Sequence, residues 1–287
     1  MFSNVMLHAV TILFFAGGPV QPPGGGSDVG GFEIDASALA NRPADTLPQQ
    51  RLPASAFAVE AIWSGLVQSS EQPGLVDAIG DREYFESTTW YLERNELTGA
   101  VLALRKPVPV DPQPQDENAL RLDSLQRLSA WGLPATEVQR VLQRRVLVQH
   151  ESDNLQQPTP PIVHRYKTFV FRGINGVPIE GSRAVLTHHR DGSFNRALIN
   201  WPPLAPTGHK LRSDLTVPEI VARAIAALRR AGEREGEATL TWCYVPTELE
   251  DGSIALELVV NARMPATHYE DGTSEEPRVI TVKIDAY

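Results

Sequence analysis

The chain has 287 residues, which predicts about two domains. Apolar side chains make up 42% of it, enough to build a packed core, and this argues against wholesale disorder. Lys and Arg total 26 against 35 Asp and Glu, and the formal net charge of −9 argues against a general nucleic-acid-binding protein. Cys243 is the single cysteine, which excludes an intrachain disulfide and a multi-cysteine zinc or iron–sulfur site.

The beginning of the chain has the pattern of a targeting segment. The apolar run Val5–Phe15 is shorter than the ~20 residues that cross a bilayer, and the small residues Ala16-Gly17-Gly18 follow it. Residues 1–18 therefore resemble a secretory signal peptide, which predicts a secreted or periplasmic protein with no stable membrane span. The first four residues contain no Lys or Arg, and Pro19 is unfavourable after a cut, so a misassigned start codon or a buried N-terminal strand stays an alternative.

Residues 19–53 are rich in Pro, Gly, Ala and Gln, and we predict a flexible tail. The alternative is that part of this segment packs along the domain. Phe57–Leu66 follows as a short helix or a buried strand. The proline-rich stretches Lys106–Asp116 and Gln156–Pro161 are predicted loops, because proline lacks a backbone donor and restricts its predecessor.

The first structured block, residues 54–210, opens with the pattern of a β-hairpin. Aromatic and Thr residues dominate Tyr84–Leu92, and the apolar stretch Ala100–Leu104 follows a turn. From Asn118 onward the apolar period changes from two to about three. The sequence therefore predicts a helix that starts near Asn118.

A second helix is predicted from Pro134, after Gly132 ends the first one. Its apolar stripe consists of Val138, Val141 and Leu142. Its basic residues are Arg140, Arg144 and Arg145. We interpret them as a solvated face of that helix, with an anionic-ligand site as the alternative.

Three strands joined by tight turns close this block. The strands are His164–Phe171, Arg183–His188 and Phe194–Trp201, and the turns are Asn175-Gly176 and Asp191-Gly192. Asn-Gly and Asp-Gly tolerate positive φ, so these dipeptides favour hairpins.

The second block, residues 211–287, repeats the order of helix and then strands. Thr216 and Glu219 match a capping box at the start of the helix. The strands are Leu240–Val245, Ile254–Val260 and Val279–Ile284, with the turns Asp251-Gly252 and Asp271-Gly272 between them. The predicted fold class is therefore α+β, with helices packed on antiparallel meander sheets.

One part of the first block resembles a known family. HRYKTFVFRGINGVPIEGSRAVLTHHRDGSF, at residues 164–194, is similar to the propeptide module of thermolysin- and fungalysin-type metalloproteases, which is related to PepSY domains. Residues 211–287 resemble a PepSY unit more loosely. The resemblance implies two successive PepSY/cystatin-like blocks. The sequence contains no His-Glu-x-x-His, so what it implies is a propeptide-like domain without the protease.

Chemistry-bearing motifs are scarce, so we expect no catalytic residues, no cofactor and no metal, and therefore no enzyme. Neither Gly-x-Ser-x-Gly nor a Walker-type loop occurs. His188-His189 with Asp191 comes nearest to a metal cluster, but adjacent strand side chains point to opposite faces, so we expect exposed turn residues. Cys243 is predicted to be a buried structural thiol.

The segment Trp201-Pro202-Pro203 leaves the first block with an aromatic side chain and rigid prolines, and it is the candidate partner contact. The alternative is that Trp201 closes the core. The resemblance implies an exported, non-catalytic binding domain that inhibits or chaperones a peptidase in trans, with no nucleic-acid partner. The alternatives are a cell-envelope structural or interaction module with no peptidase partner, and an enzyme of unrecognised type.

Overall fold

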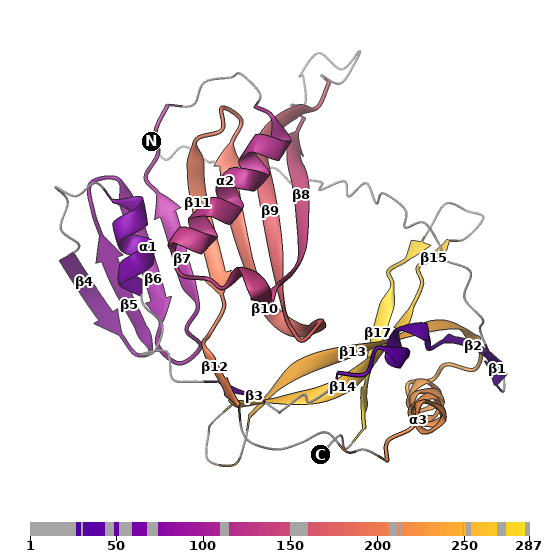
Figure 1. Ribbon diagram of the computed structural model, residues 1–287. Helices are drawn as coiled ribbons and strands as arrows, with labels where there is room; N and C mark the ends of the chain where they lie inside the picture. The colour runs from indigo at the N-terminus through magenta and orange to yellow at the C-terminus, as the bar shows by residue number, and fades with distance from the viewer. Residues whose placement is uncertain are drawn as a thin grey trace, which may run out of the picture.

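The fold is taken from a computed structural model of the chain. It describes residues 27–29, 31–43, 49–51, 59–67, 74–109, 115–149, 160–206, 212, 214–248, 250, 254–268 and 274–284. The predicted signal peptide, residues 1–18, lies outside the described residues, as do the predicted turns Asp251-Gly252 and Asp271-Gly272. Within the described ranges, three α-helices accompany one large sheet of 15 strands (Figure 1).

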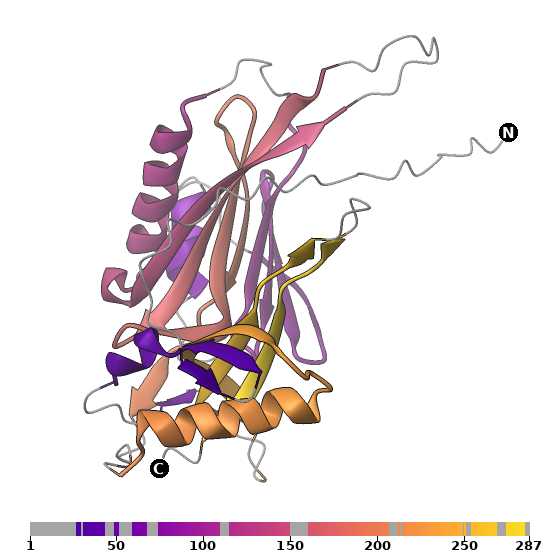
Figure 2. The same ribbon diagram turned by 90° about the vertical axis from the view of Figure 1, so that its right-hand side faces the viewer.

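The first unit is an antiparallel sheet with two helices on one side. Its strands pair in the order β4-β5-β6-β7-β11-β10-β9-β8. They are β4 (Gly74–Ile79), β5 (Arg82–Glu86), β6 (Trp90–Asn95), β7 (Val101–Arg105), β8 (Val138–Val148), β9 (Ile162–Ile174), β10 (Val177–His189) and β11 (Phe194–Asn200). Helices α1 (Val59–Leu66) and α2 (Glu117–Ala130) lie on the same side of this sheet, and Figure 2 shows no helix on the other side.

Helix α2 forms where the change of period predicts it. Asp116 caps its start by accepting a hydrogen bond of 3.0 Å from the Asn118 backbone N–H. At its end, Gly132 has a φ of +82°, a left-handed conformation that glycine adopts without steric cost. The predictions for this helix and its last turn are confirmed.

The second predicted helix of the block is wrong. Residues Ala135–Glu137 form a short 3-10 helix, and Val138–Val148 is strand β8. The apolar residues of this stretch also suit an edge strand, and β9 offers a full ladder of hydrogen-bond partners. Pairing with β9 therefore decides that this stretch is a strand and not a helix, although the local sequence is compatible with both. The predicted basic helix face does not exist.

The second unit combines both ends of the chain. From the N-terminal part it takes β1 (Ser27–Val29), β2 (Phe32–Asp35), the 3-10 helix η1 (Ser37–Ala40) and β3 (Gln49–Arg51). From the later part it takes β12 (Leu204–Pro206), α3 (Val217–Arg230), β13 (Gly236–Glu248), β14 (Ile254–Met264), β15 (Thr267–His268), β16 (Ser274–Glu275) and β17 (Arg278–Lys283). Helix α3 lies on this sheet, and Thr216 Oγ1 accepts a hydrogen bond from the Glu219 N–H, as the capping box predicts.

The segment predicted as a tail contributes to the core of the second unit. Strand β2 runs parallel to β13, and the side chains of Phe32 and Ile34 are 0% and 1% exposed. They pack in the cluster that contains Leu228 of α3 and Leu240 of β13. For residues 31–43 the structure therefore shows the alternative interpretation, in which part of the segment packs along the domain.

Strand β10 joins the two units. Asn175 and Gly176, with φ of +52° and +78°, form the predicted tight turn between β9 and β10. A bulge follows near Gly181, which has a φ of +72°. Before this bulge, Ile179 pairs in parallel with Tyr244 of β13, so one long strand belongs to both parts of the sheet.

The predicted fold class, α+β with helices packed on antiparallel meander sheets as two successive PepSY/cystatin-like blocks, is wrong. The protein is mostly sheet, and the sheet is mixed, because β2 and β10 both run parallel to β13. The prediction failed where chain segments far apart in sequence pair. Local periodicity contains no signal for such pairing.

Candidate functional site

The predicted contact segment lies mostly inside the first unit. Trp201 is 2% exposed, and its Nε1–H donates to Glu137 Oε2 over 2.9 Å. Arg172, also 2% exposed, donates to Glu137 Oε2 over 2.7 Å and to the Pro202 carbonyl oxygen. Pro202 is buried and Pro203 half-buried. Because the indole ring is buried, it closes the core, which was the alternative interpretation, and it is not an exposed contact.

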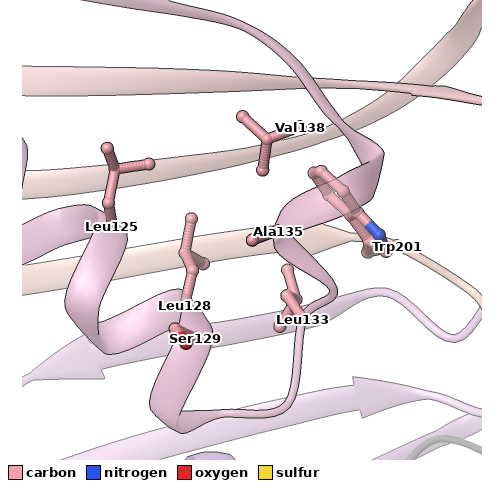
Figure 3. A pocket seen from close by; sticks show the side chains of 7 residues that line it. All are labelled: Leu125, Leu128, Ser129, Leu133, Ala135, Val138 and Trp201. Carbon is pink, nitrogen blue, oxygen red and sulfur yellow. The ribbon is translucent and has the colours of Figure 1, made fainter.

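A shallow apolar hollow adjoins this network. It holds about 250 Å³ and is lined by Leu125, Leu128, Ser129, Leu133, Ala135, Val138 and Trp201. Figure 3 shows these side chains around the end of α2 and the start of β8. A hollow of this composition can accept an apolar side chain, and Ser129 contributes a hydroxyl to its lining.

A second hollow, of about 580 Å³, lies between α1 and strands β5 and β6. Its lining consists of Val59, Glu60, Trp63, Ser64, Glu83, Phe85 and Arg94. Glu83 and Arg94 form an ion pair there, and Glu60 adds a second acid to the lining.

His188 is buried, contrary to the expectation of an exposed turn residue. Its side chain is 0% exposed, and Nε2 lies 2.8 Å from Asp123 Oδ2 in α2. The same carboxylate oxygen accepts a hydrogen bond from Arg127 Nε over 2.7 Å. His189 points to the other face and contacts Asn195. The two histidines therefore do not share a site, as strand alternation predicts. The described residues contain no group of three His, Cys, Asp or Glu that could hold a metal ion.

The burial of His188 predicts a loss of stability in mild acid. Burial lowers the pKa of His188, and this outweighs the Asp123 carboxylate, which raises it. Below pH ~6.5 the unfolded chain binds this proton while the folded chain does not, so the free energy of unfolding falls as the pH falls. We expect His188→Gln to remove more than half of the decrease seen by urea denaturation between about pH 7 and pH 5.

His189→Gln is the matched control for this prediction, because this imidazole is only half-buried and the variant should keep most of the decrease. An unchanged pH profile in His188→Gln would contradict the assignment of the effect to His188.

Cys243 has the environment predicted for it. The thiol is buried, with the residue 4% exposed, and burial raises its pKa to about 11. The expectation of a buried thiol is confirmed, and the thiolate that a nucleophile requires is disfavoured.

The feature that stands out is the side of the first sheet opposite α1 and α2, which we call the open face. On β9, Thr168 and Val170 point to α2 and are fully buried, and Ser124 of α2 donates a hydrogen bond to Thr168. The alternating residues Phe169 and Phe171 point to the open face and are half-buried. Strand β9 therefore carries apolar side chains on both faces, although helices cover only one of them.

Apolar side chains on the open face align into one row across five strands. Strand pairing places them side by side in the order Leu142, Phe169, Val185, Leu198 and Leu102. All five are half-buried, and none belongs to either of the two core clusters or packs against one of them. We call this set the apolar row. It is a contiguous apolar stripe that the described core does not use.

Cations flank the apolar row on both sides. They are Arg140, Arg144, Lys167, Arg183 and Arg196. In the part of the chain that the structure describes, none of these five makes an ion pair, although the Arg140 guanidinium lies 5.0 Å from the centre of the Phe171 ring. Beyond the row, Glu93, the register partner of Leu102, pairs with Arg82 over 2.8 Å, which neutralises this acid. The open face is therefore basic within an acidic chain.

Sequence reasoning missed the open face for a specific reason. The sequence predicts a helix for Arg140 and Arg144. On a helix these two residues share one face, and Leu142 between them lies on a different face. On a strand all three residues share one face. The signal that could have revealed the open face is the alternation of side chains in β9. Lys167, Phe169 and Phe171 occupy every second position there and therefore share one face.

Comparisons with known proteins match the chain to solved structures alone. No family model and no curated protein matches it. An uncharacterized protein from Eubacterium rectale ATCC 33656 is similar, with a TM-score of 0.41 and 11% identity over 88% of this chain and 87% of that chain. The Bacillus megaterium YpeB C-terminal domain is similar, with a TM-score of 0.33 and 11% identity over 82% of this chain and 100% of that chain.

At these TM-scores neither likeness assigns a function to the chain. None of the described helices is both long and apolar enough to cross a membrane.

Proposed function

We propose that this chain is a non-catalytic domain that binds another polypeptide through the open face. The observation that carries the proposal is the apolar row, which packs in neither core and lies where no helix covers the sheet. Covering such a stripe removes apolar surface from water, which stabilises a complex by roughly 25 cal/mol per Å² before the costs of association.

A metallopeptidase is the first partner to test. The resemblance of residues 164–194 to protease propeptides supports this choice, since such modules fold their proteases and hold them inactive. The apolar run Val5–Phe15 supports an exported protein that acts outside the cytoplasm, as a secreted or periplasmic domain. The acting surface in this proposal is the open face and not the buried Trp201.

The test is a titration of the full chain against purified metallopeptidases of its producer, with binding and peptidase activity as readouts. We expect association at micromolar concentration, and we expect Leu198→Asp to weaken it at least about tenfold, because a carboxylate in the apolar row loses its hydration on binding. Leu122→Asp is the matched control, since Leu122 is 55% exposed on α2, on the opposite side of the sheet.

The outcomes separate the alternatives. Inhibition that Leu198→Asp abolishes supports the peptidase version of the proposal. Native-envelope cross-linking that recovers assembly proteins, in a manner sensitive to Leu198→Asp, identifies an envelope interaction module instead. If Leu198→Asp and Leu122→Asp leave every association unchanged, the open face is not the binding surface and the proposal is wrong.

A further inference from the structure

We infer that the open face binds an acidic, extended polypeptide segment that lies across the strands along the apolar row. This inference rests on the proposed function and names the class of partner segment. It is drawn from the placement of the five cations around the row, which form no ion pair with any residue that the structure describes.

The cations form two lines, one on each side of the apolar row, which we call the rails. Strand pairing fixes their positions. Arg140 of β8 and Arg183 of β10 are the register partners of Phe171 on β9, which lies two residues from Phe169 on the same face. Arg144 and Arg196 lie on the other side, in the row that contains Lys167. Residues two apart on a strand are ~6.6 Å apart, so each rail runs about 7 Å from the centre of the apolar row.

The dimensions fit a short stretch of extended chain. The row crosses five strands, and neighbouring strands are ~4.8 Å apart, so it is about 19 Å long. An extended polypeptide covers ~3.3 Å per residue, so about six residues lie on the row. In an extended segment with three residues per turn, as in polyproline II, apolar side chains at every third position would contact the row, and acidic side chains at the two positions between would lean toward the two rails.

Charge decides which partner suits this face. Five cations that form no ion pair among the described residues favour a partner that carries carboxylates, because a partner that carries cations would repel them. A second copy bound by the same face would place these cations against one another, which disfavours a symmetric dimer through the open face.

The chemistry of the row favours a polypeptide over a nucleic acid. Single-stranded nucleic acids bind proteins by stacking their bases on aromatic side chains. Four of the five residues of the apolar row are aliphatic. Phe171, beside the row, already has the Arg140 guanidinium over it, and Tyr84 and Tyr91, farther along the open face, lie against each other. Apolar side chains of a polypeptide are the groups that match Leu142, Val185 and Leu198.

The test measures binding of labelled synthetic peptides to the full chain by fluorescence anisotropy. The probes are a peptide that repeats Leu-Glu-Glu, the same peptide with Lys for Glu, and the same peptide with Gln for Glu. We expect the Glu peptide to bind at least about tenfold more tightly than the Gln peptide at about 50 mM salt, and this preference to shrink at about 500 mM salt, where charges are screened beyond ~4 Å.

Variants locate the effect. Arg144→Glu with Lys167→Glu should abolish the preference for Glu, because these substitutions reverse the charge of one rail. Arg121→Glu is the matched control, since Arg121 is exposed on α2 and lies on the opposite side of the sheet. Circular dichroism and the urea midpoint show whether each variant folds.

Each result decides the inference. A folded double variant that still prefers the Glu peptide overturns it. If the three peptides bind equally and Leu198→Asp abolishes their binding, the inference of an acidic segment is wrong. The proposed function, binding through the open face, is then still supported. If no peptide binds, or if a single-stranded oligonucleotide or an anionic vesicle binds instead, the inference is wrong, and the metallopeptidase titration decides the proposed function separately.

Discussion

Replacing Phe32 with alanine should lower the free energy of unfolding of the full chain by about 3–5 kcal/mol. The ring is 0% exposed and packs in the core cluster of the second unit, together with Ile34 and residues of α3 and β13. Truncation leaves a cavity that the surrounding strands cannot fill, because β2 is fixed by its parallel pairing with β13. Urea denaturation of the full chain measures the loss.

Val279→Ala is the control for Phe32→Ala. Val279 is 55% exposed on β17 in the same unit, so its truncation should cost less than about 1 kcal/mol. Equal denaturation midpoints for the two variants would show that residues 32–35 do not pack in the core. They would then behave as the flexible tail that composition alone predicts.

The second large effect is expected at Glu137. Its carboxylate accepts hydrogen bonds from Arg172 and from the Trp201 indole, and both donor residues are 2% exposed. Glu137→Ala leaves this buried guanidinium without its carboxylate. The full penalty for breaking a buried pair is about 3–5 kcal/mol, but Glu137 itself is 26% exposed and water can replace part of the interaction. We therefore expect a loss of about 2–3 kcal/mol by urea denaturation.

Two further variants test the reason for this loss. Arg172→Met in the Glu137→Ala background should restore part of the stability, because an apolar side chain has no charge to desolvate. Glu117→Ala breaks the more exposed ion pair with Arg145 and should cost less than about 1 kcal/mol. If Glu137→Ala costs no more than Glu117→Ala, the network around Trp201 does not depend on its carboxylate.

These stability effects and the binding proposals concern different sides of the same sheet. Arg172 and His188 point to the helices and are fixed by partners in or near α2. Phe169 and Val185, on the same two central strands, point away from the helices and belong to no core cluster. The period of two in β9 and β10 thus separates a structural face from the face proposed to bind a partner.

Local sequence signals determined many of the elements. The period of Leu122, Leu125 and Leu128 and the cap at Asp116 specify α2, because helix formation depends on neighbours within four residues. The Asn175-Gly176 turn specifies the β9–β10 hairpin, because few other dipeptides adopt positive φ at two successive residues.

Only the tertiary structure decided the rest. The state of Val138–Val148, the parallel pairing of β2 with β13, and the burial of His188 and Trp201 all depend on partners more than ten residues away. The open face belongs to this group, because its row exists only when five strands align in register. Helix and turn signals are written in adjacent residues, whereas pairing between distant strands is selected by the total burial and hydrogen bonding of the folded sheet.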